Sequence, residues 1–423
     1  MVVGARSAVF AAVPDLGVIV VDEEHDSSYK HEADPRYDAR RVAAKRARLH
    51  AAVAVFGSAT PRPEAWRGIP RRVSLPARIG GRLPAVEVVD LRGDGGYPFT
   101  RPLLDGLAAI EDGGGRAILL QNRRGAASAL HCRTCARSWR CDRCDVALTL
   151  HGRGLRCHHC GRREPVPRAC TACGSVDLAQ LGAGTGRIES DLRARFPGLV
   201  VLRLDADVAT AAGEPEQTLE RFAREPAAVL VGTQLVAKGH DVPGVELAAV
   251  LDADVALAVP DFRAEERAFA LLTQLSGRPG RPGDGRGRVI VQTWDPGLRV
   301  VTLAARHAVE EFLEGELERR AALGYPPFRR LVRVLVAAPE PAVAEQAAAA
   351  LVSAAGPALP GDAVLGPAPL VRLRGRGRAH LLVKTEDARR AAAVFRGLLR
   401  SLAGDLRRAG ATAVVDVDPQ SLA

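Results

Sequence analysis

Eight cysteines, grouped as four pairs with two residues between the members of each pair, are the residues of this chain best suited to metal chemistry. They are Cys132, Cys135, Cys141, Cys144, Cys157, Cys160, Cys170 and Cys173, and the sequence has no other cysteine. A two-residue gap lets both thiolates of a pair contact one tetrahedral zinc ion through a tight turn. Eight thiolates complete two four-sulfur sites and leave no open position, so the spacing predicts two structural zinc ions rather than catalytic ones.

A disulfide scaffold is the alternative interpretation of these cysteines. However, no signal peptide precedes them, and the repeated two-residue spacing favours metal over bridges. Four histidines lie among the cysteines and could each replace a ligand: His131, His151, His158 and His159. Because eight thiols are available, we expect these histidines at the surface or around the sites. The spacing leaves open which pairs share an ion.

A cluster of charged residues at the end of an apolar run is suited to nucleotide chemistry. Residues 16–21 are apolar and rich in β-branched side chains, which predicts a buried parallel strand, and the sequence DEEH (residues 22–25) follows directly. Asp22 would hold Mg²⁺, Glu23 would polarise the attacking water, and His25 would link the nucleotide to the rest of the lobe. Taken alone, the pattern also fits a solvated loop of charges.

A second apolar run, Val53 to Phe56, ends in the sequence GSATP (residues 57–61). The two strand ends, in this order, look like motifs II and III of a superfamily 2 helicase. Aromatic and basic residues interleave between them and could stack bases and hold phosphates. These candidate DNA-binding residues are Tyr29, Lys30, Tyr37 and Arg40. The alternative is a connecting loop that leads into a helix.

The centre of the chain repeats this pattern. Apolar runs at residues 117–120, 229–231 and 247–251 end in NRRG, GTQ and DAD. Farther on, Arg278 and Arg281 lie three residues apart and could reach a triphosphate as arginine fingers from a facing lobe. As a lone pattern they would indicate only a basic loop.

Strands and helices that alternate along the chain must position these residues. Helices are expected near residues 103–110 and 309–323, and the Gly/Pro-rich segment 93–98 indicates a linker. The cysteine run interrupts the second lobe and is therefore an insertion. Beyond residue 300, strands and alanine-rich helices indicate a small α/β domain. At strand spacing, four arginines would share one face there: Arg372, Arg374, Arg376 and Arg378.

Length and charge set outer bounds on the molecule. A chain of 423 residues predicts two or three domains, and the formal charge of +10 favours a polyanionic partner such as nucleic acid. An arginine-rich composition bias would give the same charge. No apolar run reaches the roughly 18 residues that a membrane span needs. These features predict a soluble protein of the reducing cytoplasm.

Taken together, the motifs resemble the PriA family of replication-restart helicases, also called primosomal protein N-prime. The resemblance covers essentially the whole chain and rests on DEEHDSSYK, RYDAR, GSATP, NRRG, the eight cysteines, GTQLVAKGHD, LDAD, GRPGR, YPPF and the closing DVDP. The cysteine run between the two halves of the second helicase lobe is its most specific feature.

The resemblance implies an α/β fold with two RecA-like helicase lobes, the first of them incomplete. The expected segments are the end of lobe 1 (1–94), the start of lobe 2 (95–130), the two-zinc insertion (131–174), the rest of lobe 2 (175–300) and a C-terminal α/β domain (301–423). Nested pairing is implied, in which the outer ion takes the first and last pairs. ATP and Mg²⁺ would be bound with the help of Gly239 and Asp241, and Lys238 would contact DNA.

The resemblance also implies partners and a location. Family members bind abandoned replication forks and reload the replicative helicase with other primosome proteins, so branched and single-stranded DNA, primosome proteins and a nucleoid-associated place in the cytoplasm are expected. A site for single-stranded-DNA-binding protein would include Arg376. In the family, aromatic residues tend to stand where this chain has Gly377 and Ala379, which weakens that assignment.

The chain departs from the family at its start. A complete member opens with a DNA-binding domain and a winged helix, and its first lobe begins with a phosphate-binding loop of the GKT/S type. No glycine-rich turn of this sequence is followed by Lys-Ser or Lys-Thr. We expect either a gene model that starts at an internal methionine or a branch that has lost helicase function.

Three functions therefore compete. The first is a restart factor with an incomplete ATPase, and the second is a 3′-to-5′ helicase whose N-terminal part lies outside this sequence. The third is a zinc-ribbon scaffold that binds proteins and needs no DNA.

We predict that the 423-residue chain hydrolyses ATP poorly, with or without DNA. Asp22 and Glu23 can position metal and water, but this sequence supplies no preorganised amides or lysine for the β- and γ-phosphates. That loss should reduce the rate roughly a thousandfold or more. Phosphate release should be measured for the chain and for Glu23→Gln. Robust DNA-stimulated turnover that disappears in Glu23→Gln would contradict the prediction.

Overall fold

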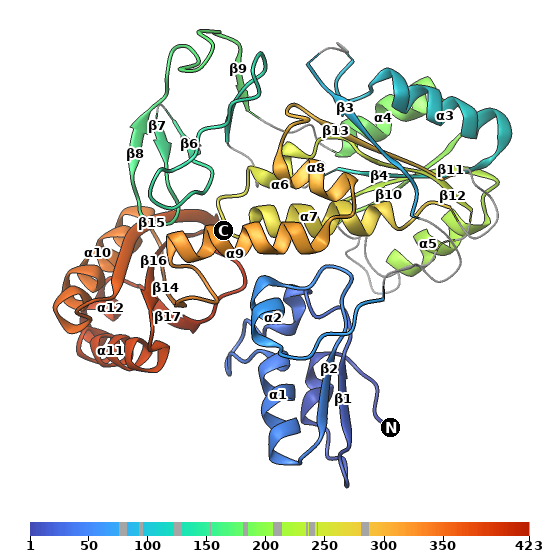
Figure 1. Cartoon of the computed structure of the whole chain (residues 1–423). Coiled ribbons are helices and arrows are strands. Elements are labelled where there is room, and N and C mark those ends of the chain that lie inside the picture. Colours follow the sequence, from blue (N-terminus) through green and yellow to red (C-terminus); the bar gives the residue numbers. More distant parts are fainter. Residues whose placement is uncertain are drawn as a thin grey trace. The chain divides into compact units, whose positions relative to one another are not determined.

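The computed structural model describes two compact units. The described residues are 1–75, 83–92, 96–121, 129–152, 154–180, 185–205, 214–233, 236, 242, 244–280 and 287–422. The first unit comprises residues 1–71, 158–162 and 313–423, and the second comprises residues 72–157 and 163–312. Figure 1 shows the elements of both.

A six-stranded parallel sheet forms the centre of the second unit. Its strand order is β10-β11-β4-β12-β13-β3. The strands are β3 (Val86–Asp90), β4 (Gly115–Leu120), β10 (Val200–Leu204), β11 (Ala227–Gly232), β12 (Val245–Val250) and β13 (Arg288–Thr293). The central strands are almost entirely apolar, as expected for a parallel sheet that is covered on both faces.

Helices cover this sheet on both faces (Figure 1). The helices of the unit are α3 (Arg101–Gly113), α4 (Thr185–Arg195), α5 (Glu214–Arg224), α6 (Asp254–Leu257), α7 (Ala264–Ser276) and α8 (Arg299–Ala305). Leu103, Leu107 and Ile110 of α3 recur at helical spacing and pack with Leu192 of α4 against alternate residues of the central strands. This apolar layer fixes the sheet whose carboxyl ends carry the sequence motifs.

The cysteine-rich insertion contains only short strands. They are β5 (Leu130–Cys132), β6 (Thr149–His151), β7 (Gly154–Arg156), β8 (Arg163–Pro165) and β9 (Leu178–Gln180). β5 pairs with β9, and β6, β7 and β8 form a separate antiparallel sheet. The β5–β9 pair closes the insertion, because it joins its first and last strands.

The first unit begins with a small parallel α/β element. The strands are β1 (Val18–Val21) and β2 (Val53–Phe56), and the helices are α1 (Ala39–Leu49), α2 (Pro63–Gly68) and the 3₁₀ turns η1 (Arg6–Phe10) and η2 (Ser27–Tyr29). β1 and β2 pair in parallel. On one face of the pair, Val18, Val20, Val53 and Val55 are exposed.

An antiparallel sheet, in the order β15-β16-β14-β17, forms the C-terminal part of the first unit. The strands are β14 (Arg330–Ala338), β15 (Ala363–Leu373), β16 (Arg376–Thr385) and β17 (Thr412–Val417). The helices of this part are α10 (Pro341–Ala358), α11 (Ala388–Ser401) and α12 (Ala403–Arg408), and α9 (Val309–Leu323) precedes it. Alanines of α10 and Phe395 of α11 pack on the buried valines of the sheet.

The structure differs from the sequence-based expectations at two boundaries. β3 lies on the lobe 1 side of the expected boundary at residues 94 and 95, yet it pairs with β13 in the six-stranded sheet. α8 lies beyond residue 300 for most of its length, yet its residues Val300 and Val301 are buried against α7 in the second unit. A Gly/Pro-rich stretch marks a turn, but it does not reveal which sheet the flanking strand joins.

The arginine-rich segment is a hairpin and not one strand. Leu373 of β15 pairs with Arg376 of β16, so Arg374 and Gly375 form the turn between them. Both turn residues have positive φ, as a two-residue hairpin requires. The expectation of four arginines on one strand face was therefore wrong, because it missed this turn. Within the described part of the chain, no helix has both the length and the apolar composition needed to cross a membrane.

Arg320 of α9 is the largest fully buried side chain that carries a charge. Its Nε donates to Glu316 at 2.7 Å, and its guanidinium lies 3.3 Å from Glu64 and donates to the Pro326 carbonyl at 3.1 Å. Both Arg320 and Glu316 have no exposed surface. Loss of the cation would leave buried acceptors without a donor.

We predict that Arg320→Met lowers the free energy of unfolding by about 3 kcal/mol or more, because it removes one partner of a buried ion pair. The control is Arg408→Met, which removes an exposed pair with Asp405 and should cost less than about 1 kcal/mol. Urea unfolding of both variants measures the difference. Equal losses would show that the buried cation has no special role.

Candidate nucleotide site and zinc centres

The two motifs of the first unit lie at the same edge of the β1–β2 pair. Val21 is opposite Phe56, so Asp22 and Gly57 follow directly at the carboxyl ends of both strands. The Glu24 amide donates to the Gly57 carbonyl at 2.9 Å. Glu23 has a φ of 45°, and its amide donates to the Asp22 carboxylate at 2.9 Å. Adjacent parallel strands therefore bring DEEH and GSATP together.

His25 is the side chain that joins the two motifs. Its Nδ1 lies 2.8 Å from the Ser58 hydroxyl and 3.3 Å from the Glu23 carboxylate. The same hydroxyl accepts a hydrogen bond from the Thr60 amide at 3.0 Å. A change at Glu23 can therefore reach the GSATP turn through one imidazole. The catalytic roles of Asp22, Glu23 and His25 stay predictions.

The aromatic candidates of the DNA-binding loop are half-buried. The Tyr29 hydroxyl donates to the Asp22 carbonyl at 2.6 Å, and the Tyr37 ring meets Phe10 edge to face at 4.9 Å. Burial and then the nearby Asp22 and Asp26 carboxylates raise the pKa of Tyr29, so its phenol stays protonated as a donor. Tyr29 thus connects the loop to the backbone of the carboxylate motif.

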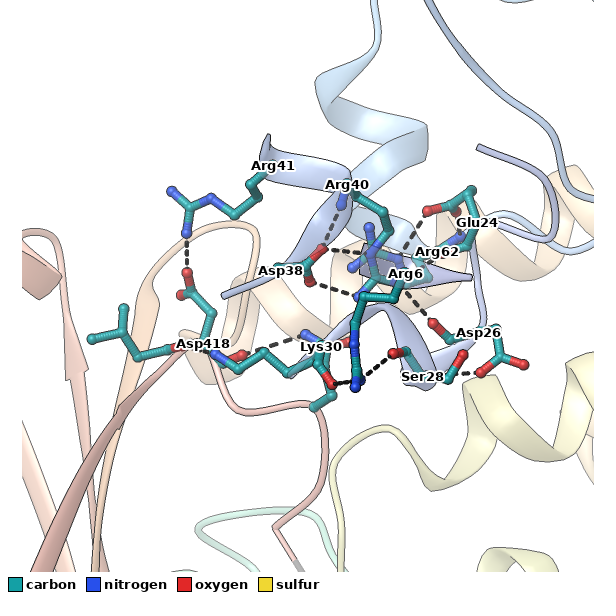
Figure 2. A network of polar contacts seen from close by, with 12 residues as sticks. Arg6, Glu24, Asp26, Ser28, Lys30, Asp38, Arg40, Arg41, Arg62 and Asp418 are labelled. Atoms are coloured by element: carbon teal, nitrogen blue, oxygen red, sulfur yellow. Dashed lines mark hydrogen bonds and ion pairs between the residues drawn. The ribbon is translucent and has the colours of Figure 1, made fainter. Parts of the chain in front are cut away.

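The cationic candidates, Lys30 and Arg40, are almost fully buried, at 4% and 3% exposed. The Lys30 ammonium lies 3.0 Å from Asp416 and donates to the Val417 carbonyl at 2.6 Å. Figure 2 shows the Arg40 guanidinium enclosed by protein acceptors. Both cations are paired with acceptors of the protein itself. A role in DNA binding stays a prediction for each.

A buried ion pair behind the carboxylate motif was missed in the sequence. Glu24 is 1% exposed and accepts from the Arg62 amide at 2.7 Å and from its guanidinium at 2.9 Å. The Glu24 carboxylate outweighs desolvation and raises the pKa of Arg62. The sequence did contain one sign of this pair, because Arg62 directly follows GSATP and is therefore close to the carboxylate motif. The pair joins the two motifs by contacts separate from those of His25.

Polar residues follow the strands at the carboxyl edge of the second unit's sheet. They are Gln121 after β4, Asp205 after β10, Thr233 after β11 and Asp252 two residues after the end of β12. The carboxyl ends of parallel strands are where open α/β sheets bind ligands. The buried Asp252 accepts from the Tyr97 hydroxyl at 3.1 Å. Burial and then the Asp254 carboxylate raise the pKa of Asp252 to about 7.

The remaining nucleotide and DNA candidates belong to the second unit. Arg278 follows α7, and its amide donates to the Leu275 carbonyl at 2.9 Å. Four candidates lie outside the described residues: Lys238, Gly239, Asp241 and Arg281. Their roles stay predictions.

The eight cysteines form two clusters, in the nested arrangement. Cys132, Cys135, Cys170 and Cys173 make the outer cluster, and Cys141, Cys144, Cys157 and Cys160 make the inner one, each with its thiols within 4.8 Å of one another. The outer cluster has Sγ–Sγ distances of 3.7 and 3.6 Å. A tetrahedral zinc with bonds of about 2.3 Å requires about 3.8 Å between sulfurs. The thiols therefore fit zinc without rearrangement.

Each cysteine pair closes a turn that ends in a left-handed residue. The four residues that follow the second cysteines all have positive φ: Ala136, Asp145, Gly161 and Gly174. The amides of Ala136, Asp145 and Gly174 donate to the carbonyl of the first cysteine at 2.8–2.9 Å. Sequence reasoning missed this signal, because only two of the four are glycine. The repeated geometry directs both thiols of a pair to one point.

Backbone amide donors favour the thiolate form of Cys170. Burial would raise the pKa of Cys170, but the amides of Ala172 and Cys173 and the neighbouring thiols outweigh it and lower the pKa to about 6. Zinc binds thiolates and not thiols. The amide of Arg137 would lower the pKa of Cys135, but burial and the neighbouring thiols outweigh it and raise that pKa to about 12, so the outer cluster still releases protons when zinc binds.

None of the four histidines is a member of either cluster. His131, His158 and His159 are at most 3% exposed and adjoin the cysteines in the sequence, whereas His151 is exposed, so both parts of the expectation, surface or around the sites, are represented. The His131 ring lies 5.4 Å from Trp294, and His159 Nδ1 lies 2.9 Å from the Tyr325 hydroxyl. His131 and His159 thus contact aromatic residues outside the insertion, and the two clusters consist of sulfur ligands alone.

We predict two zinc ions per chain, measured by elemental analysis of the purified protein. Cys132→Ser/Cys135→Ser should retain one ion, and alkylation with mass mapping should then find Cys170 and Cys173 reactive while the inner four remain protected. Consecutive pairing would instead release Cys141 and Cys144. The unsubstituted chain with chelator is the positive control, because removal of both ions should expose all eight thiols.

Three family models match separate parts of the chain. Residues 141–165 match the PriA DNA helicase Cys-rich region (CRR) domain, residues 175–283 match the helicase conserved C-terminal domain, and residues 321–420 match the primosomal protein N C-terminal domain. The match of the Cys-rich region, together with the two four-thiol clusters, identifies the clusters as two structural zinc sites.

Curated relatives match nearly the whole chain. Proteins named "Replication restart protein PriA" are 37% identical in Bacillus subtilis (99% of this chain, 54% of the relative) and 40% identical in Treponema pallidum (99% and 64%). The Thermotoga maritima protein of that name is 36% identical (100% and 56%). The chain thus spans about half to two thirds of the length of these relatives.

A solved structure of S. cerevisiae Dbp5 bound to RNA and ADP BeF3 aligns with a TM-score of 0.37 at 12% identity, over 73% of this chain and 63% of its own. The three matched domains follow the same order along the chain as the sequence motifs. The curated relatives indicate the same family as these domains. The chain belongs to the PriA family of replication restart proteins.

Proposed function

We propose that this protein binds abandoned or stalled replication forks and promotes primosome assembly and reloading of the replicative helicase. The observation that carries the proposal is the pair of four-thiol clusters placed inside a helicase C-terminal domain, between β4 and the residues matched from 175 onward. The Cys-rich region that matches here is a PriA domain. In this chain, the strands of the helicase sheet precede and follow it in the sequence.

The proposal includes ATP and Mg²⁺ at the first unit's motifs. Asp22 would hold the metal and Glu23 the attacking water, with His25 coupling them to Ser58 at 2.8 Å. Arg278 and Arg281 would act as fingers, and Gly239 and Asp241 would contact the nucleotide. The family activity is ATP-dependent 3′-to-5′ unwinding, which needs phosphate contacts that the motifs of this sequence do not supply.

Exposed arginines on the zinc insertion support DNA binding. Those that the structure leaves exposed are Arg133, Arg137, Arg140, Arg143, Arg163 and Arg168. Two of them also pair with carboxylates: Arg133 lies 3.8 Å from Asp177, and Arg140 lies 2.9 Å from Asp145 and 3.5 Å from Glu265. The insertion therefore offers phosphates several guanidinium groups on one small, metal-held fold.

Partners beyond DNA extend the proposal. The zinc insertion would also receive primosome proteins, in the cytoplasm at the nucleoid. A site for single-stranded-DNA-binding protein would include Arg376, whose guanidinium already donates to the carbonyls of Ala337 at 3.0 Å and Gly410 at 2.6 Å. Binding there would have to displace these contacts or use the exposed neighbours Arg372 and Arg374.

We predict that the chain binds a fluorescent fork more tightly than duplex of equal length, with a log–log salt slope of about −3 to −4 if about four arginines meet phosphates. Arg133→Ala/Arg137→Ala/Arg143→Ala should make the slope shallower by about 2 to 3. Titrations at two salt concentrations measure both quantities.

The matched control removes three exposed arginines from α11 and α12: Arg396→Ala/Arg400→Ala/Arg407→Ala. It changes the net charge equally, so it should leave the slope nearly unchanged if the insertion is the contact surface. Equal slopes for the two triple variants would reduce the protein to a nonspecific polycation. Absence of DNA binding would favour the zinc-ribbon scaffold.

A further inference from the structure

The 22–40 loop, which connects β1 to α1, is closed by hydrogen bonds at both of its ends. Arg40 donates to the carbonyls of Glu24 at 2.7 Å and Asp26 at 3.1 Å, and it pairs with both carboxylate oxygens of Asp38. Figure 2 shows this arginine at the centre of the loop. On its outer side, Arg6 donates to the carbonyls of Ser28 at 2.7 Å and Lys30 at 2.9 Å. The loop conformation is therefore specified by cations that reach backbone oxygens.

The third set of contacts comes from the other end of the chain. Lys30 extends from the loop to the end of β17, where its ammonium pairs with Asp416 at 3.0 Å and donates to the Val417 carbonyl at 2.6 Å. One residue farther, Asp418 pairs with Arg41 at the start of α1 and accepts from Arg330 of β14 at 2.7 Å. The loop and the helix after it are thus both attached to the same strand end (Figure 2).

Because the Lys30–Asp416 ion pair is buried, it favours the loop conformation in which the two side chains meet. Lys30 is 4% exposed and Asp416 is 2% exposed. Asp416 also lies 3.5 Å from Arg333, so the carboxylate is flanked by two cations. A buried charge that loses its partner is strongly unfavourable. A loop conformation that separated Lys30 from Asp416 would leave buried charges without partners. An exposed ion pair could separate at little cost, because water would solvate both charges.

We propose that Asp416 and Asp418 are positioning residues for the 22–40 loop, and that the C-terminal strand β17 thereby sets the orientation of the carboxylate motif. The connection runs from Asp416 to Lys30, then through the adjacent Tyr29, whose hydroxyl donates to the Asp22 carbonyl. Lys30 acts in this arrangement as an anchor of the loop and not as a phosphate contact. The proposal goes beyond fork binding and does not depend on it.

Hydrogen exchange of the full chain tests the proposal without DNA or nucleotide. The loop amides of Asp26, Lys30 and His31 are hydrogen-bonded to Glu23, Ser27 and Tyr37. In Asp416→Asn, peptides that cover residues 22–40 should exchange about tenfold faster or more, while peptides from α10 and β16 keep their rates. Lys30→Met should give the same local pattern, because it removes the other partner.

The double variant, Lys30→Met/Asp416→Asn, should be no faster than the faster single variant, because both substitutions remove one interaction. Asp405→Asn is the control: its carboxylate lies in the same domain and pairs only at the surface. Unchanged loop exchange in Asp416→Asn, acceleration spread over the whole domain, or additive effects in the double variant would each overturn the proposal.

The DNA affinity of Asp416→Asn gives a second test, because charge and loop order should change that affinity in opposite directions. Asp416→Asn removes one negative charge, so electrostatics alone would strengthen binding to DNA. A disordered 22–40 loop should instead weaken binding to single-stranded DNA about threefold or more, because Tyr29 and Tyr37 lose their fixed positions. Tighter binding by the variant would contradict the positioning role. If the unsubstituted chain binds no DNA, fork binding fails while the exchange experiment still decides this proposal.

Discussion

Coordination of zinc by eight thiolates is the constraint on which the middle of this molecule depends. The strands of the insertion are three residues long, and pairs of such strands are not stable in water by themselves. The outer cluster joins Cys132 to Cys173 across 41 residues, beside the β5–β9 pair. The inner cluster lies between the two cysteine pairs of the outer one in the sequence, so both sites hold the same short segment.

Elsewhere, buried ion pairs take over part of the role that aromatic packing has in many proteins. The sequence is 4% aromatic and 26% charged, and several charges are almost fully enclosed, among them Lys30, Arg40 and Arg320. Each has acidic or carbonyl partners within hydrogen-bond distance. Such pairs add little net stability compared with apolar contacts, but they strongly penalise any arrangement that separates the partners.

Local patterns allowed much of the fold to be predicted from sequence. β2 and α9 have the expected bounds, and the two cysteine clusters are those that the spacing and the family resemblance indicated. Contacts between distant segments were not predictable. A lysine between two tyrosines gives no sign in the sequence that it contacts β17, and a strand such as β3 does not reveal its sheet. The turn at Arg374 was missed because an arginine gives no signal for positive φ.

The attachment of the 22–40 loop to β17 also has a consequence for synthesis. The ammonium of Lys30 and the carbonyl of Val417 are 387 residues apart in the sequence. At about 5–20 residues per second, a ribosome needs roughly 20–80 s to make the second partner after the first. During that interval the partners of Lys30 on β17 do not yet exist. The contacts that attach the 22–40 loop to β17 can therefore form only after that strand has been made.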